Sequence, residues 1–199
     1  MRRFLAAFIP MTFVAFQSTR GEDSELSEKI VYPSPDKKFA IRISYDPSFS
    51  NDEEEKNIAI SREATRAIDL VTMPGKEVVT KLGAEDGGLE GKVIWSVDSQ
   101  WVAFGLSNGQ RVTETYVYHR SANGFEKIPN EELSVDAGGS PRNQYITPLR
   151  WLKPGTLLLK QFTIFRGGEG DSTIEFTVRF DEKGSFRVIN RKKVRSKDE

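Results

Sequence analysis

The strongest constraint on the fold is a short pattern that occurs three times along the chain. Residues 33–41, 95–103 and 151–159 each combine a tight turn with an apolar run directly after it. Turn residues such as Ser, Pro, Asp and Gly reverse the chain direction, and an apolar run bounded by them is typical of a buried strand. The copies start about 60 residues apart, and a repeat of that size predicts a fold assembled from similar units.

The rest of the chain also favours strands over helices. The best helical candidate, residues 61–71, soon meets Pro74-Gly75. By contrast, residues 174–180 alternate apolar and polar side chains, turn at residues 181–184 and return as residues 185–189, which predicts a final hairpin. We therefore expect a mainly β fold of antiparallel repeats, each with a tight turn followed by three strands.

The turns resemble those of a known repeat family. Ser34-Pro35-Asp36 and Trp95-Ser96-Val97-Asp98 are similar to the W-S-P-D-G-type turn of the TolB-like β-propeller repeat, which introduces the innermost strand of a blade. The resemblance implies blade-like repeats over about residues 31–190. The first copy has Pro33 where Trp is usual, and the third lacks both the Ser and the Asp. Propellers typically close with four or more blades, so a partial propeller-like arrangement and a curved β-sandwich both remain open.

The first residues have the pattern of an export signal. Arg2 and Arg3 precede an uncharged stretch from Phe4 to Phe16, which is too short to span a membrane as a helix. We expect a signal peptide at residues 1–21 and a single β domain at residues 22–199, with repeats starting near 33, 95 and 151. The protein would then be periplasmic or secreted, with no transmembrane segment after signal removal. An uncleaved anchor is the alternative.

Composition excludes several kinds of chemistry. The chain has no Cys, so disulfides, thiolate nucleophiles and iron–sulfur clusters are excluded, and a single His removes most His-based metal sites. Lys and Arg number 29 and Asp and Glu 29, so no overall charge favours nucleic acid. We expect no cofactor, no metal site and no nucleic-acid partner.

One motif points to an enzyme, but its surroundings do not. Residues 105–109 match G-x-S-x-G, the nucleophile elbow of α/β-hydrolases, and would pair Ser107 with His119. The elbow requires a helix after the Ser and an acid between the Ser and the His. Residues 110–118 favour a strand instead, and Glu114 is the sole acid in between. We expect a turn between two strands and no catalytic residues, with a serine hydrolase as the alternative.

The candidate binding residues lie in a long segment expected to be a loop. Within residues 134–147, Arg142, Asn143 and Tyr145 offer hydrogen-bond donors and an aromatic face, and Arg166 beside two glycines is a further candidate. Loops on a rigid β scaffold often bind ligands, although a tolerated insertion is equally compatible. The sequence favours an exported, non-catalytic binding or scaffold module for a protein or envelope component. A degenerate propeller fragment without activity is another alternative.

The C-terminal stretch carries a dense positive charge. Residues 187–197 include six Lys and Arg residues and contain no Asp or Glu. Three blade-like repeats cannot close a ring, so a sheet edge must stay open, and charge is a common protection for such an edge. We expect a monomer whose last strand is guarded by its Lys and Arg side chains, and a salt-sensitive self-association through that strand is the alternative.

The export hypothesis predicts a shortened mature chain. Protein exported by its host should begin between about residue 18 and residue 22. Intact-mass measurement checks this prediction, and a chain that keeps Met1 and fractionates with membranes would contradict it.

Overall fold

The computed structural model describes residues 26–49, 64–83, 88–107, 109, 111–129, 133–181 and 183–194. The expected signal peptide lies outside these residues, so export and the domain boundaries stay predictions. Two short 3-10 turns, Pro47–Phe49 and Arg166–Gly168, are the helical elements of the described part. In that part no helix is long and apolar enough to cross a membrane.

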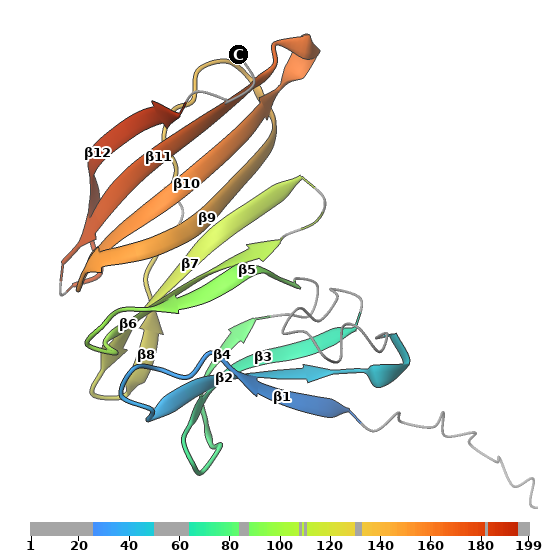
Figure 1. Cartoon of the computed structure of the whole chain (residues 1–199), viewed down its shortest axis with the longest axis vertical. Helices are drawn as coiled ribbons and strands as arrows, with labels where there is room; N and C mark the ends of the chain where they lie inside the picture. Colours follow the sequence, from blue (N-terminus) through green and yellow to red (C-terminus); the bar gives the residue numbers. More distant parts are fainter. Residues whose placement is uncertain are drawn as a thin grey trace, which may run out of the picture.

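In the described part of the chain, twelve strands form three consecutive meanders of four strands, which we call the first, second and third units (Figure 1). The first unit comprises β1 (Ser27–Val31), β2 (Phe39–Tyr45), β3 (Thr65–Thr72) and β4 (Val78–Gly83). The second comprises β5 (Gly88–Trp95), β6 (Trp101–Ser107), β7 (Val112–Ser121) and β8 (Gly124–Lys127). The third comprises β9 (Pro141–Lys153), β10 (Thr156–Phe165), β11 (Asp171–Phe180) and β12 (Phe186–Val194).

The mainly β, antiparallel fold class is confirmed, with one parallel contact. Strands within each unit pair antiparallel with their sequence neighbours. The second and third units are joined by a short parallel pairing in which Val112 and Thr113 of β7 face Gln144 and Tyr145 of β9. This contact merges the two units into one curled eight-stranded sheet, while the first unit remains a separate four-stranded sheet.

Two hydrophobic cores hold the units face to face. The first core packs Ile41, Ile68 and Leu70 of the first unit against residues such as Phe104 of the second. The second core packs the opposite face of the second unit against the third. It contains Trp101, Ala103, Val117, Leu157, Leu159, Phe176 and Val178. Because side chains alternate along a strand, the middle unit supplies one face to each core.

The predicted turns lie between the first and second strands of their units. In the first unit the Ser34 hydroxyl donates to Asp36 at 2.6 Å, and the Phe39 backbone N–H donates back to that hydroxyl at 3.1 Å. Burial by itself would raise the pKa of Asp36, but the hydrogen bonds from Ser34 and from the Lys38 backbone, together with the Arg120 and Lys38 charges, lower it below its usual value.

The second turn repeats this arrangement. The Ser96 hydroxyl donates to Asp98 at 2.5 Å and accepts from the Trp101 N–H at 2.9 Å. The Asp36 backbone N–H also donates to the Ser99 hydroxyl at 3.0 Å, so the two turns contact each other.

A second repeated contact, made by a Trp side chain, links each unit to the one before it. The Trp95 indole N–H donates to the Tyr32 carbonyl at 2.8 Å, and the Trp151 indole N–H donates to the Ile94 carbonyl at 3.2 Å. Tyr32 and Ile94 each directly precede the corresponding turn of their own unit. Each Trp therefore bonds the equivalent backbone position of the preceding unit.

Two local expectations were wrong. Each unit has four strands rather than three, because β1, β5 and β9 precede the turns and were not expected as members of the repeat. Residues 141–147 of the expected loop belong to β9, because they pair with β10.

The alternation of side chains along β11 predicts that substitutions on its two faces differ in their effect on the free energy of unfolding. Phe176 is 1% exposed in the second core, whereas Glu175 lies on the opposite face of β11. Phe176→Ala should reduce the free energy of unfolding by about 3 to 5 kcal/mol, because it opens a cavity in the core. Glu175→Ala is the matched control and should cost less than about 1 kcal/mol. Denaturant unfolding compares the two, and equal losses would contradict the assigned faces.

Candidate functional site

Ser107 and His119 lie far apart. In the antiparallel β6–β7 pairing, Ser107 faces Thr113, whereas His119 faces Trp101 at the other end of the same strand. Six residue steps of about 3.3 Å separate these positions by about 20 Å. The Ser107 hydroxyl donates to the Gly109 carbonyl at 2.7 Å, and the His119 ring stacks on Trp101 with centroids 3.9 Å apart. The pair therefore does not form a nucleophile–base dyad.

The four candidate binding residues gather at one end of the third unit. Arg142, Asn143 and Tyr145 lie in the first part of β9, and Arg166 directly follows β10, the partner of β9. The Arg166 backbone N–H donates to the Ser140 carbonyl at 2.9 Å, and its Nε donates to the Pro141 carbonyl at 3.3 Å. The antiparallel pairing thus brings together residues that the sequence keeps apart.

Side-chain hydrogen bonds organise three of these residues. The Arg142 Nε donates to Asn143 Oδ1 at 3.0 Å, and the Asn143 amide donates to the Tyr145 hydroxyl at 2.7 Å. The Tyr145 ring stacks on Phe162 of β10, with centroids 6.2 Å apart and planes 19° from parallel. The result is a group of cationic, amide and aromatic side chains, which we call the Tyr145 face. Its Asn143 and Tyr145 lie on the side of β9 opposite Ile146 of the second core.

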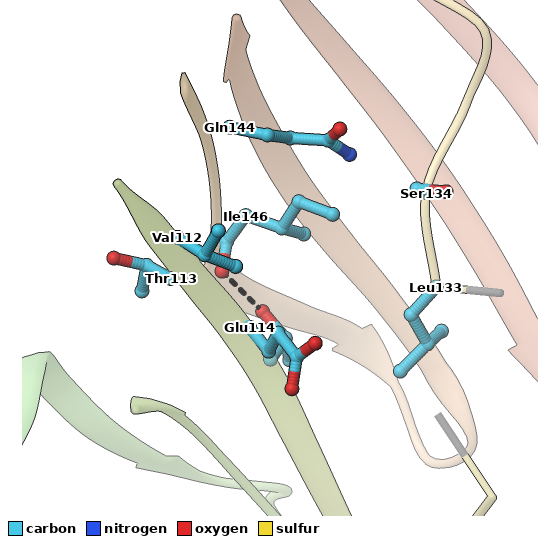
Figure 2. Close-up of a pocket in the computed structure, with 8 residues that line it drawn as sticks. Val112, Thr113, Glu114, Leu133, Ser134, Gln144 and Ile146 are labelled. Atoms are coloured by element: carbon cyan, nitrogen blue, oxygen red, sulfur yellow. Dashed lines mark hydrogen bonds between the residues drawn. The ribbon is translucent and has the colours of Figure 1, made fainter. Parts of the chain in front are cut away.

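A cavity of about 230 Å³ opens where β7 and β9 diverge (Figure 2). Beyond the two paired positions, the Thr115 hydroxyl replaces a strand-to-strand backbone bond by donating to the Ile146 carbonyl at 2.8 Å. The cavity is lined by Val112, Thr113, Glu114, Thr115, Leu133, Ser134, Gln144 and Ile146. Hydroxyl, amide and carboxylate groups thus share the wall with aliphatic side chains, an arrangement suited to a small polar molecule.

A second cavity of about 170 Å³ lies beneath residues 133–139, which we call the strap. Ser134 and Gln144 line both cavities, so the two are neighbours. Gln161, which is 1% exposed, accepts from the Val135 N–H at 2.9 Å and donates to the Val135 carbonyl at 2.8 Å. One side-chain amide therefore satisfies both backbone groups of Val135, and it anchors the strap to the sheet.

Sequence reasoning missed the polar lining of these cavities. Gln161 and Thr163 occupy the inward positions that Leu157 and Leu159 begin on the same strand. A change from apolar to polar at inward positions marks the place where the core ends. Ser172 faces Thr163 across the β10–β11 pairing, and its buried hydroxyl has no hydrogen-bond partner among the described residues. The change from apolar Leu157 and Leu159 to polar Gln161 and Thr163 at every second position was the sequence signal for this polar lining.

Within the described residues, no group of three or more His, Asp or Glu side chains could hold a metal ion. The ionic contacts described lie in the first unit and at its boundary with the second. They include Arg42 with Asp69 at 2.7 Å and Arg120 with Asp36 at 3.7 Å. These pairs are structural, since they lie away from the Tyr145 face and from both cavities.

Comparisons with known proteins give little similarity. No protein-family model matches the chain, and a search of curated proteins finds no significant match. Among solved structures, TolB from Acinetobacter baumannii matches with a TM-score of 0.34 and 14% identity, over 81% of this chain and 40% of that one. This chain thus aligns with less than half of that protein's length, and a TM-score of this size does not establish a shared fold.

The two hydrogen bonds between Gln161 and Val135 predict that this side chain stabilises the strap. Gln161→Leu removes both bonds to Val135 and leaves a partly buried N–H and carbonyl without their partner, which should cost about 2 kcal/mol of unfolding free energy. The strap should also become more sensitive to proteolysis, because its anchor is lost. Lys160→Leu, at the exposed neighbouring position, is the control. Denaturant melts and limited proteolysis make the comparison, and similar behaviour of both variants would contradict the anchoring role.

Proposed function

We propose that this protein is an exported, non-catalytic binding or scaffold module that contacts a protein or envelope component through the Tyr145 face. The observation that carries the proposal is the convergence of Arg142, Asn143, Tyr145 and Arg166 at one end of the third unit. Two of them are cations, and the other two share a hydrogen bond beside the Phe162 ring. Aromatic and Arg side chains are enriched where proteins recognise partners.

The position of this face supports binding. The β9–β10 pairing fixes the backbone beneath it, and the Tyr145–Phe162 stack and the Asn143–Tyr145 bond restrict the side chains. A preorganised surface loses less conformational entropy when a partner binds. The face is also open, because the third unit packs against the second through its other side.

The separation of Ser107 from His119 supports a non-catalytic role. A hydrolase would need the nucleophile and its base within hydrogen-bond reach, whereas the β6–β7 pairing holds these two residues at opposite ends. The cavities beside the strap add a place for a small polar molecule.

Site-specific photo-crosslinking in the host tests the proposal. A photoreactive phenylalanine analogue at Tyr145 should yield a discrete adduct in the cell envelope, since it replaces an aromatic side chain on the binding face. The same analogue at Val97, which is 78% exposed on a turn of the second unit, is the control and should yield none.

Two results would overturn the proposal. Equal adducts at both positions, or none at Tyr145, would show that this face has no specific partner. Covalent labelling by an active-site serine probe, abolished by Ser107→Ala, would instead establish the hydrolase alternative.

A further inference from the structure

β12 is an open edge of the eight-stranded sheet (Figure 1). It pairs with β11 on one side, and no described strand pairs with the other. Residues 187–193 are all exposed, so the strand is solvated on both of its faces. An edge of this kind presents backbone N–H and carbonyl groups to any extended chain that matches it.

The charge of β12 is of one sign and lies on both faces. Lys192 faces Glu175 across the sheet, on the side away from the second core, whereas Arg191 and Lys193 face the core residues Phe176 and Ile174. Arg187 adds a fourth cation, and the strand contains no acid. None of these four cations is in an ion pair within the described part of the chain.

A register shift divides the strand into two parts. Thr177 faces Asn190, but the next residue of β11, Val178, faces Val188, which leaves Ile189 without an opposite residue. The uninterrupted segment is therefore Asn190–Val194, where three successive residues are cationic. Val188 and Ile189, 41% and 40% exposed, place two apolar side chains directly before it.

This pattern disfavours pairing with a second copy of the same strand. Two β12 strands side by side would bring cations opposite cations, and like charges at directly opposed positions are destabilising. An acidic strand would place carboxylates beside those cations at the same backbone spacing. The charge therefore excludes one partner and selects another, which is how specificity commonly arises at an edge.

We propose that β12 binds an extended acidic segment of a partner protein as an added strand along Asn190–Val194. Backbone hydrogen bonds would supply the pairing, and acidic side chains on both faces of the added strand would meet Arg191, Lys192 and Lys193. An apolar residue of the same segment would cover Val188 and Ile189. This site is separate from the Tyr145 face, and the proposal does not depend on the function proposed for that face.

Fluorescence anisotropy with synthetic peptides tests this site on the full-length mature protein. The probe is a short labelled peptide of glutamate and valine, compared with one that carries glutamine for glutamate and one with proline at its centre. The acidic peptide should bind, the glutamine peptide should bind at least about tenfold more weakly, and the proline peptide should lose binding because it cannot continue the ladder. Added salt should weaken the acidic peptide's binding.

Charge-reversed variants locate the site. Lys192→Glu with Lys193→Glu should weaken binding of the acidic peptide at least about tenfold, whereas Lys37→Glu with Lys76→Glu, on exposed turns of the first unit, should leave it unchanged. Lys192→Ala with Lys193→Ala is a milder second pair, and circular dichroism verifies the fold of each variant. Hydrogen exchange should show new protection at the amides of Asn190–Val194 when the acidic peptide is bound.

Several outcomes would overturn the proposal. Equal binding of the proline peptide would mean charge attraction without strand addition, and equal binding by the reversed Lys192 and Lys193 variant would place the site elsewhere. A salt-resistant dimer in light scattering that buries β12 would make a second copy the occupant. Failure of any of these tests would leave the crosslinking result at Tyr145 unaffected, so the two proposals fail separately.

Discussion

Two indole hydrogen bonds fix how the units of this protein follow one another. Trp95 and Trp151 each donate to the backbone carbonyl that precedes the turn of the unit before them. A partly buried indole N–H needs an acceptor, so each bond helps set the position of one unit against the unit before it. The first unit has Pro33 at the equivalent position, which carries no indole N–H, and no unit precedes it among the described residues.

The two cores and the cavities follow from that stacking. The second unit has a neighbour on each face, so β6 contributes apolar side chains to both cores, and its six residues from Trp101 to Leu106 are all buried. The third unit tilts away from β7 after two parallel pairs, and the polar residues Gln144, Gln161 and Thr163 lie where the apolar core ends. Buried polar groups must find partners, and the Gln161 amide finds them in the strap.

The third unit carries both proposed binding surfaces for one structural reason. Its inner side packs on the second unit, and no described unit covers its outer side or its last strand. The outer side then holds the ordered group around Tyr145, and the last strand holds an unpaired edge with cations on both faces. The first is a fixed array of side chains, and the second is a backbone template whose charge restricts its partners.

The sequence by itself determined the strand content, the two Ser–Asp turns and the inward face of the final hairpin, because these depend on local turn chemistry and on the alternation of side chains. It also placed Arg142, Asn143, Tyr145 and Arg166 among the binding candidates, although whether they bind a partner stays a prediction. Only the tertiary structure decided that each unit has four strands, that residues 141–147 extend β9, and that Gln161 anchors the strap. Those features depend on pairing between residues distant in sequence, and pairing partners leave no local pattern in the chain.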